Sequence, residues 1–427
     1  MLMKNRAEYV WDYTSEINIE RLKECAEKEY YSDRSVEAKS FNNAVVLPYM
    51  PVPNSSKALG GVVDEDENYI EISKQHIVGK DVEGKYDFTS SKTEDKKIMW
   101  FGFYHNHWGH FLTEQVSRCW YLVDHSPEEE DFYVAYCLKK DTINKGMDGT
   151  FREFLSILGV SDERLLLVEE PTRFSEVIIP EQSAERCSWY TDKFLSIFDK
   201  MVSNVAYDTG NRKVYLTRSQ TKNFANTQIG EKAIIKVFKK AGFEIVAPER
   251  ISLREQIATM NSCDEIAIVL GSLTHNILFC KPGIKVTILN RNLGSDVYQP
   301  PISEAKNATI TYVDCHLTFF PVVFAMGPFF FYFTDLFRKY CEDKGYEYKK
   351  FREGKFRTHI KLIWYFLMYL QNVTPDALDG WGADETISYD VMSRYKYFRA
   401  QLDDYDSNSE RKIRNGFSKV FKKILSL

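Results

Sequence analysis

Long apolar runs are scarce in this chain of 427 residues. The most apolar stretch, 317–333, is interrupted by Pro321, Gly327 and Pro328, and the next, 362–370, is short. A membrane-spanning helix needs about 20 consecutive apolar residues, and proline breaks helical hydrogen bonding. We therefore expect both stretches to be buried packing segments.

An excess of positive charge is also missing. The formal net charge is −5, so the chain has no global basic field of the kind that nucleic-acid binders use. Its 44% hydrophobic and 27% charged residues are typical of a soluble globular protein, and its length predicts two or three domains. The aromatic content of 15% suits carbohydrate stacking and a thick core equally well.

Paired cysteines and an apolar leader are absent as well. The eight cysteines are scattered and none forms a CxxC pair, which excludes a zinc ribbon and a thioredoxin motif. The N-terminal stretch "MLMKNRAEYVWDY" has no apolar signal-peptide core. We therefore expect reduced thiols and a cytoplasmic protein.

The common nucleotide and metal motifs do not occur. No GxGxxG, P-loop or HExxH is present, so dinucleotides and ATP are not indicated. The only early acidic candidate of the DxD kind, Asp64 to Asp66, sits in the polar turn "VVDEDENY" and is expected to be a solvated loop.

Periodicity predicts an α/β fold. Short strands fill the first hundred residues, a helical period begins at 108, and 187–205 is an amphipathic helix that could bridge two lobes. Strands and helices then alternate over 212–291, which predicts a parallel doubly wound sheet with ligands at the carboxyl ends of its strands. We expect two Rossmann-like lobes facing a cleft, 1–205 and 206–318, and a helical region, 319–427, packing across both.

Three of the eight histidines lie in "HNHWGH" at 105–110. A cupin-like metal site is disfavoured, because Glu114 falls inside a helical pattern rather than on a strand. His110, Glu114 and Arg118 are spaced i, i+4 and i+8 and would project into the cleft at the end of a strand. A substrate or catalytic role is favoured, while a structural cluster and a metal site stay open.

Two further stretches suit an anionic ligand. Arg218 ends the strand of "VYLTRSQTKN", where a guanidinium can clamp a diphosphate, although a surface arginine would fit the position as well. "VLGSLTHNILF" is a strand, a Gly271–Ser272 turn and a helix start with His275 and Asn276 in its first turn. The N–H groups of such a start can hold a phosphate or a ribose hydroxyl.

Three motifs, in order, resemble glycosyltransferase family 61, especially its bacterial branch from capsule and exopolysaccharide loci. They are "HWGHFLTEQVSRCWY", "VYLTRSQTKN" and "AGFEIVAPERISLREQIATMNSCDEIAIVLGSLTHNILFCKPGIKVTILNR", within about residues 100–292. Two details depart from the family. After the strand arginine, the family usually has a further arginine and then an Asn-Glu pair, and of these only Glu231 is present here. Many members also have HGA before the last helix, where this chain has "GSLTHN".

The resemblance implies a GT-B fold, a nucleotide-sugar donor held mainly by the second lobe, inversion at the anomeric carbon, and no cofactor or metal. We expect His110 or Glu114 to be the general base, with His110 favoured and Glu114 orienting it. The expected donor-binding residues are Thr217, Arg218, Ser219, Gly271, Ser272, His275 and Asn276. The expected substrate-binding residues are Asn106, His107, Arg118, Glu249 and Gln256.

The expected function is therefore inverting transfer of a sugar, hexosyl or pentosyl, from a nucleotide diphosphate to a glycan acceptor in capsular or exopolysaccharide biosynthesis. The growing glycan would be lipid-linked at the inner face of a membrane. A non-enzymatic glycan-binding relative and a histidine-based metal hydrolase are the alternatives.

The C-terminal stretch 409–427 has the pattern of a basic amphipathic helix. Its apolar residues fall on one face: Ile413, Phe417, Val420, Phe421, Ile424 and Leu425. Such a helix can lie on an anionic membrane surface, or its apolar face can pack back on the first lobe.

Overall fold

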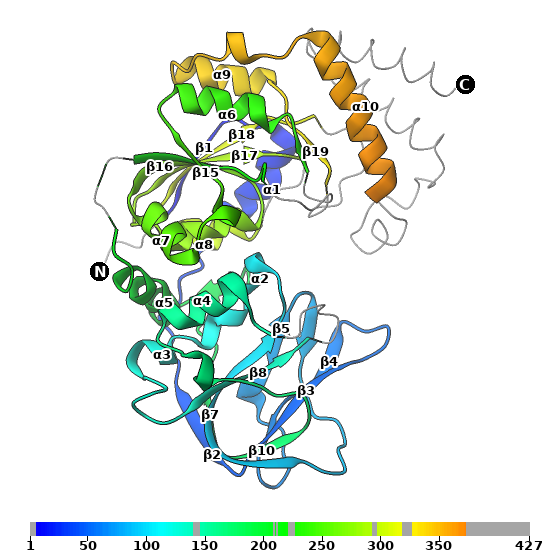
Figure 1. Cartoon of the computed structure of the whole chain (residues 1–427), viewed down its shortest axis with the longest axis vertical. Coiled ribbons are helices and arrows are strands. Elements are labelled where there is room, and N and C mark those ends of the chain that lie inside the picture. Colours follow the sequence, from blue (N-terminus) through cyan, green and yellow to red (C-terminus); the bar gives the residue numbers. More distant parts are fainter. Residues whose placement is uncertain are drawn as a thin grey trace.

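The computed structural model describes residues 6–139, 146–207, 210, 212–220, 227–292, 297–317 and 327–372. Two β-sheets with their helices form two lobes, one above the other along the long axis of the molecule (Figure 1). This arrangement confirms the predicted α/β, GT-B-like fold with two lobes.

The first lobe is built on a mixed sheet in the order β5-β6-β4-β3-β10-β7-β8-β9, with β2 added to β10. β7 pairs in parallel with both β8 and β10, and its residues 98–104 are all buried. Met99 and Phe101 pack on one face of the sheet and Ile98 and Trp100 on the other, which explains the continuous apolar run. The strands are β2 (Ala38–Asn42), β3 (Val45–Pro51), β4 (Lys57–Val63), β5 (Gln75–Ile77), β6 (Lys80–Val82), β7 (Lys92–Tyr104), β8 (Tyr133–Leu138), β9 (Leu165–Leu167) and β10 (Thr172–Pro180).

Short helices and one hairpin complete this lobe. The predicted helix at 187–205 begins only at Asp192, because 184–190 form the β11–β12 hairpin. The elements are α2 (Trp108–Thr113), α3 (Tyr121–Asp124), α4 (Gly149–Ile157), α5 (Asp192–Ser203), η1 (Glu71–Ser73), η2 (Gln115–Arg118), η3 (Asp162–Arg164), β11 (Ala184–Glu185) and β12 (Trp189–Tyr190).

The second lobe contains a parallel sheet in the order β1-β18-β17-β16-β13-β15. The predicted doubly wound pattern over 212–291 supplies β13, β15, β16 and β17. The boundary at 205 does not hold for the first strand, because β1 pairs in parallel with β18 and so extends the second sheet. The strands are β1 (Glu8–Tyr13), β13 (Arg212–Leu216), β15 (Glu244–Val246), β16 (Cys263–Val269), β17 (Lys285–Asn290) and β18 (Thr309–Asp314).

Helices cover both faces of this sheet (Figure 1). α6 (Glu231–Lys240) and α9 (Asp335–Asp343) lie on the face away from the first lobe, whereas α7 (Leu253–Asn261) and α8 (Gln299–Ala305) lie between the sheet and that lobe. A capping box starts α7, with the Ser252 side chain accepting from the Glu255 N–H and the Glu255 carboxylate accepting from the Ser252 N–H. The segment after Gly271 is a 3-10 helix, η6 (Ser272–Phe279).

The two lobes share one apolar core. Phe154 of α4 and Phe198 of α5 belong to the same buried cluster as Ile257 of α7 and Phe279 of η6. The Phe198 and Phe279 rings are 5.5 Å apart. Glu153 of the first lobe accepts hydrogen bonds from two N–H groups at the start of α7, at 2.7 and 3.0 Å. The boundary between the lobes is therefore closed by packing along α4 and α5.

The described part of the predicted 319–427 region packs mainly on the second lobe rather than across both. β19 (Phe329–Phe330) pairs with β14 (Gln228–Ile229), α9 contacts β1 and β18, and α10 (Lys355–Asn372) contacts β19. The remaining short elements are α1 (Glu16–Ala26), η5 (Pro248–Arg250) and η7 (Lys349–Phe351). The predicted basic helix at 409–427 lies outside the described residues.

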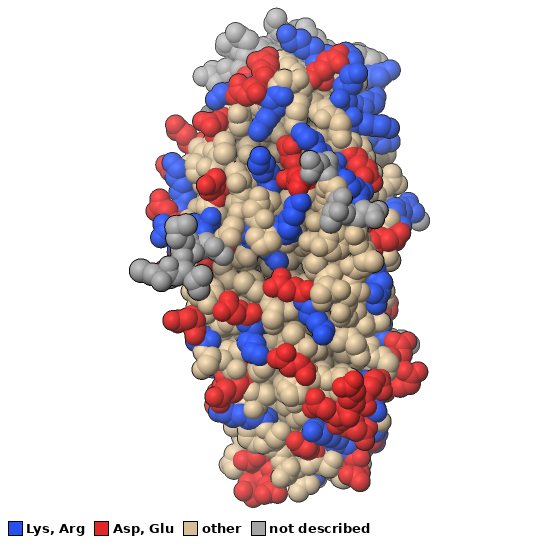
Figure 2. All heavy atoms as spheres, turned by 90° about the vertical axis from the view of Figure 1, so that its left-hand side faces the viewer, with Lys and Arg blue, Asp and Glu red and all other residues tan. Residues whose placement is uncertain are grey.

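Across the described ranges, no helix has both the length and the apolarity to cross a bilayer, and 362–370 is part of α10. All eight cysteines are described and all are free thiols. Figure 2 shows one face of the molecule, with acidic side chains gathered low on the first lobe and basic ones near the top of the second.

Candidate active site

The "HNHWGH" stretch forms the turn between the carboxyl end of β7 and the start of α2. His107 caps α2: its backbone is extended (φ −144°) and its ring Nδ1 accepts a hydrogen bond from the His110 N–H at 3.4 Å. Burial, followed by the neighbouring imidazoles of His110, His105 and His275, lowers the pKa of His107 to about 3. A neutral ring suits a helix cap, so His107 fixes the turn.

The two residues before His107 have different surroundings. His105 exchanges two hydrogen bonds of 3.0 Å with the Gln115 side chain, one through its N–H and one through its carbonyl. Asn106 is exposed at the tip of the turn, where it can reach a substrate.

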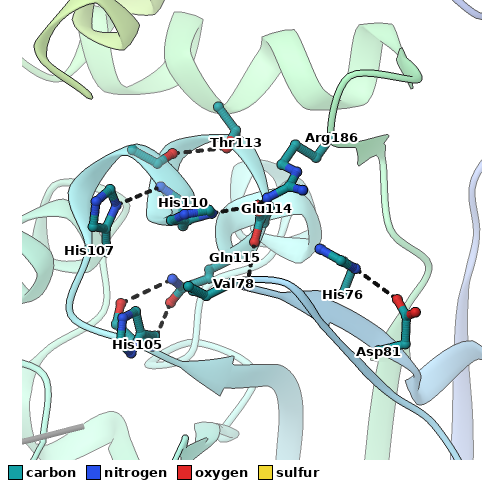
Figure 3. A network of polar contacts seen from close by, with 11 residues as sticks. His76, Val78, Asp81, His105, His107, His110, Thr113, Glu114, Gln115 and Arg186 are labelled. Atoms are coloured by element: carbon teal, nitrogen blue, oxygen red, sulfur yellow. Dashed lines mark hydrogen bonds and ion pairs between the residues drawn. The ribbon is translucent and has the colours of Figure 1, made fainter. Parts of the chain in front are cut away.

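His110 and Glu114 form a close pair (Figure 3). His110 Nδ1 lies 2.6 Å from Glu114 Oε1, and Arg186 Nη1 lies 2.8 Å from the same oxygen. Glu114 Oε2 accepts from the Val78 N–H at 3.0 Å. The His110 side chain is 16% exposed and that of Glu114 only 2%. His110 is therefore the member of the pair that can touch a substrate.

Electrostatics keep Glu114 ionised. Burial alone would raise the pKa of this carboxyl, but the hydrogen bond and charge of His110, the charge of Arg186 and the Val78 N–H together hold the pKa below its ordinary value. An ionised Glu114 accepts from Nδ1–H of His110, which fixes the tautomer with a lone pair on Nε2. No described residue binds Nε2, so that nitrogen is free to take a proton from a substrate hydroxyl.

Tyr298, just before α8, brings the second lobe against this pair. The Arg186 guanidinium lies 4.8 Å from the centre of the Tyr298 ring, and the His110 ring lies 6.4 Å from it. Tyr298 thus forms a wall of the site that faces the first-lobe pair.

Arg118 does not lie on one helix face with His110 and Glu114, as their i, i+4 and i+8 spacing predicted. The helical backbone is broken at Glu114 (φ −129°, ψ −51°), and the chain continues as η2. Arg118 turns into the first lobe, is completely buried, and donates to the carbonyls of Pro180, Ile72 and Lys74. Its role there is to hold three segments of the first lobe together.

In the second lobe, two arginines meet at the carboxyl ends of neighbouring strands. Arg218 follows β13, Gly271 follows β16 and Arg291 follows β17. Gly271 has φ +129°, and a Cβ there would lie 2.8 Å from Arg291 Nη2 and 3.1 Å from Arg218 Nη1. The guanidinium of Arg291 also lies 3.9 Å above the ring of Phe329. The arginine pair therefore needs a residue without a side chain between its members.

Arg291 was missed by the sequence reasoning. The sequence does contain a pattern that indicates Arg291, because "TILNR" ends a predicted strand with arginine just as "VYLTR" does at Arg218. Two guanidiniums beside bare backbone, at the carboxyl ends of parallel strands, can together hold a diphosphate, and we call this pair the arginine cradle.

Nearby carboxylates modulate this cradle. Burial lowers the pKa of Arg218, and the charges of Glu249 and Glu231 oppose that shift. Glu249 is exposed in η5, after the neighbouring strand β15, where a donor group can reach it. Glu231 is fully buried, and burial raises its pKa to about 7, although it accepts from Thr217 and Tyr215.

Thr217 and Ser219 shape the turn that carries Arg218. The Thr217 hydroxyl donates to Glu231 at 2.8 Å and accepts from the Ser219 N–H at 3.0 Å. Thr217 is buried and Ser219 is partly exposed, so of the two only Ser219 is open to a ligand.

The two halves of the site touch through small residues. A Cβ on Gly109 would lie 3.0 Å from Ser272 Oγ and 3.2 Å from His275 Cε1. Gly109 precedes His110, and Ser272 follows Gly271. His110 and the arginine cradle are thus joined by direct packing of α2 against the start of η6.

Asn276 and Gln256 hold the lobes together, which differs from their predicted ligand roles. Trp108 Nε1 donates to Asn276 Oδ1 at 2.6 Å, and Asn276 Nδ2 donates to Gln256 Oε1 at 3.1 Å. Gln256 Nε2 in turn donates to the Pro248 carbonyl at 3.0 Å. Both side chains are buried and engaged at both ends of the amide.

The described residues contain no group of three or more His, Cys, Asp or Glu side chains placed to hold a metal ion. In particular, the "HNHWGH" histidines have separate partners: His107 caps a helix, His110 pairs with Glu114 and the backbone of His105 pairs with Gln115.

Comparison with known proteins connects this geometry to a family. Residues 108–287 match the family model described as Glycosyltransferase 61. No curated protein matches the chain. Among solved structures, one similar chain is a glycosyl transferase family 9 protein from Veillonella parvula DSM 2008, which is 11% identical, with 51% of this chain and 86% of that chain covered and a TM-score of 0.25. The predicted resemblance to glycosyltransferase family 61 is therefore confirmed for residues 108–287, the part of the chain that the family model matches.

Proposed function

We propose that the protein is an inverting glycosyltransferase that moves a hexosyl or pentosyl group from a nucleotide diphosphate sugar to a glycan acceptor. One observation carries this proposal. Gly109, beside the base His110, packs on Ser272, beside the Gly271 at which Arg218 and Arg291 meet. A proton acceptor and a diphosphate cradle therefore adjoin across the lobe boundary, as transfer from a diphosphate requires.

In the proposed reaction, His110 Nε2 takes the proton of the acceptor hydroxyl. The hydroxyl oxygen forms a bond to the anomeric carbon on the face opposite the diphosphate, the bond from that carbon to the diphosphate oxygen breaks, and its electron pair leaves with the diphosphate. Arg218 and Arg291 stabilise the negative charge that develops on the leaving group. The sugar consequently inverts at its anomeric carbon.

We further propose that the reaction needs no metal and no cofactor. The two guanidiniums supply, next to the leaving oxygen, the positive charge that a divalent ion supplies in other transferases. Full activity after treatment with a chelator would agree with this proposal, whereas activity that a divalent cation restores would contradict it.

The cellular setting is proposed from the family resemblance. The acceptor would be a growing capsular or exopolysaccharide chain, lipid-linked at the inner face of the plasma membrane, and the enzyme cytoplasmic and peripheral. The basic stretch 409–427 would make the membrane contact. Co-sedimentation with anionic vesicles should then be stronger for the full chain than for a chain ending at Ser407, and equal binding would contradict this role of the tail.

A thermal-shift screen against nucleotide diphosphate sugars tests the function itself. A donor that raises the melting temperature should also yield a product whose anomeric configuration, read by NMR, is opposite to that of the donor. Retention of configuration would contradict the single-displacement reaction. Glycan binding without turnover of any donor would instead identify a glycan-binding protein.

A further inference from the structure

A polar pocket of about 510 Å³ lies on the first lobe beside the His110–Glu114 pair. Its walls are η1, the β5–β6 hairpin and the β11–β12 hairpin, and they include Gln75, His76, Asp81, Glu185 and Trp189. None of these residues belongs to the site described above.

Two contacts join this pocket to the base. Val78, two residues after His76, donates its N–H to Glu114, and Arg186, next to Glu185, forms the ion pair with Glu114. Figure 3 shows His76 and Asp81 on the other side of Glu114 from His110. The pocket and His110 therefore flank the same carboxylate.

Trp189 gives the pocket a fixed aromatic surface. Its indole is partly exposed, the Arg34 guanidinium lies 4.3 Å from the ring centre, and its Nε1–H donates to Glu185 Oε2 at 2.9 Å. A ring held in this way can stack against the apolar face of a sugar with little loss of side-chain freedom.

Two side chains that line the pocket each have a buried nitrogen without a partner among the described residues. Gln75 is 2% exposed; its Oε1 accepts from the Phe103 N–H at 2.7 Å, but its Nε2 has no partner among the described residues. His76 Nδ1 lies 2.7 Å from Asp81 Oδ1, and its Nε2 is likewise without a described partner. A buried nitrogen without a partner is costly, so a side-chain rotation that brings either one to a sugar hydroxyl would be stabilising.

The charge of the wall restricts which sugars can enter. The carboxylates outnumber the permanent cations, Arg34 and Lys74; they are Glu71, Asp81, Glu83, Glu181 and Glu185. The resulting negative potential repels an anionic glycan and favours a neutral or cationic one.

We propose that this pocket is the acceptor subsite and that it takes a glycan of neutral or amino sugars rather than of uronic acids. The proposal rests on the transferase function proposed above, because it assigns the pocket to the acceptor of that reaction.

The test measures binding of three tetrasaccharide probes to the full-length protein: glucosamine, N-acetylglucosamine and galacturonic acid tetramers. We expect affinity to fall in that order. Trp189→Ala should weaken the tightest probe about tenfold, because it removes the stacking surface. Trp364→Ala is the matched control, since Trp364 of α10 is 56% exposed and lies outside the pocket, and it should change nothing.

A charge variant gives a second readout that does not depend on the fold tolerating loss of an aromatic ring. Glu71→Lys, at an exposed position of the wall, should weaken the glucosamine tetramer about threefold and strengthen the galacturonate tetramer. The proposal is overturned if galacturonate binds as tightly as glucosamine, if neither variant alters binding, or if no probe binds at millimolar concentration.

Nucleoside diphosphate binding, compared between wild type and Arg218→Ala, is measured in parallel. If the probes behave as expected but no nucleoside diphosphate binds, the pocket is a carbohydrate site and the proposed transferase function fails. If the nucleotide binds but the probes contradict the expectations, the transferase function stands and the acceptor subsite lies elsewhere.

Discussion

The site has two walls, and they control charge in opposite ways. The first wall is the group of His110, Glu114 and Arg186 in the first lobe, and the second wall is the pair of Arg218 and Arg291 in the second lobe. In the first lobe, the Glu114 carboxylate is fully paired, by His110, Arg186 and the Val78 N–H. In the second, Arg218 and Arg291 meet beside bare backbone, and Glu231, a buried carboxyl whose charge acts on Arg218, has a pKa raised to about 7 by burial, so near neutral pH it is only partly ionised. In the proposed function, the first wall orients the base and the second wall binds the anionic donor.

Among the variants that distinguish the two walls, substitution of the proposed base should have the largest effect, and the effect should be on turnover. His110→Ala should lower turnover by roughly a factor of 10³, because general base catalysis is typically worth 10²–10⁴, while donor affinity stays unchanged. Glu114→Gln should lower turnover less, since the ring remains but loses its anionic partner. Steady-state kinetics and calorimetry measure the two quantities.

A matched histidine–carboxylate pair provides the control. His125 Nδ1 lies 2.8 Å from Glu130 Oε1 on the surface, where both side chains are 38% exposed. His125→Ala should retain full turnover. Near-normal turnover of both His110→Ala and Glu114→Gln would show that the first wall is not catalytic.

Substitutions in the second wall should weaken binding of the nucleoside diphosphate. Arg218→Ala and Arg291→Ala should each weaken nucleoside diphosphate binding by about ten- to a hundredfold, because each removes charge-assisted hydrogen bonds worth about 1.5–3 kcal/mol. Arg212→Ala is the control: it lies at the opposite end of β13, in a surface ion pair with Glu244, and should not alter affinity. Calorimetric titration decides, and unchanged affinity in Arg291→Ala would remove that residue from the cradle.

The glycine between the arginines should show a smaller effect. Gly271→Ala introduces a Cβ at 2.8 Å from Arg291 Nη2 and strains a backbone at φ +129°, so it should weaken the nucleotide about tenfold and destabilise the fold by about 1–3 kcal/mol. Gly242→Ala separates the two causes, because Gly242 has φ +90° and a Cβ there would meet no atom within 4 Å. It should lose stability while leaving the second wall intact, and equal loss of nucleotide affinity in both variants would contradict the cradle.

The smallest effect should be a pH dependence at Glu231. Its pKa in the native protein, about 7, exceeds the ordinary value of 4.5, so its contribution to stability is complete below about pH 4.5 and is lost as pH rises through about 7. Ionised Glu231 also competes with a diphosphate for Arg218. Donor affinity should therefore fall a few-fold as pH rises through about 7 in the wild type but not in Glu231→Gln.

Glu304→Gln is the control for this titration. Burial also raises the pKa of Glu304, but this carboxyl accepts from Tyr30, Tyr31 and Tyr190 instead of lying beside Arg218. The variant should keep the pH dependence of donor affinity. If Glu231→Gln keeps it too, Glu231 is not coupled to the donor site.

The second lobe was the more predictable one, for a local reason. Its strands are short apolar runs, and its helices carry their own signals, such as the Ser252–Glu255 capping box of α7. The pairing of β1 with β18 joins residues about 300 positions apart, and no local pattern encodes it.

At the site, the sequence predicted that His110 and Glu114 lie together and that Arg218 follows a strand, and the structure places them so, whereas their catalytic and donor-binding roles stay predictions. It misplaced Arg118, because a continuous helix was assumed where the backbone breaks at Glu114. The roles of Asn276 and Gln256 depend on Trp108, which reaches them from the other lobe, so only the fold reveals them.

The most direct test of the division between the walls is calorimetric titration of one nucleoside diphosphate, chosen by the thermal-shift screen, into wild type, His110→Ala and Arg218→Ala. Our account predicts equal affinity for wild type and His110→Ala, and an affinity lower by about ten- to a hundredfold for Arg218→Ala. Equal affinity in all three proteins, or an equal loss in both variants, would contradict the assignment of the base to the first lobe and of the donor to the second.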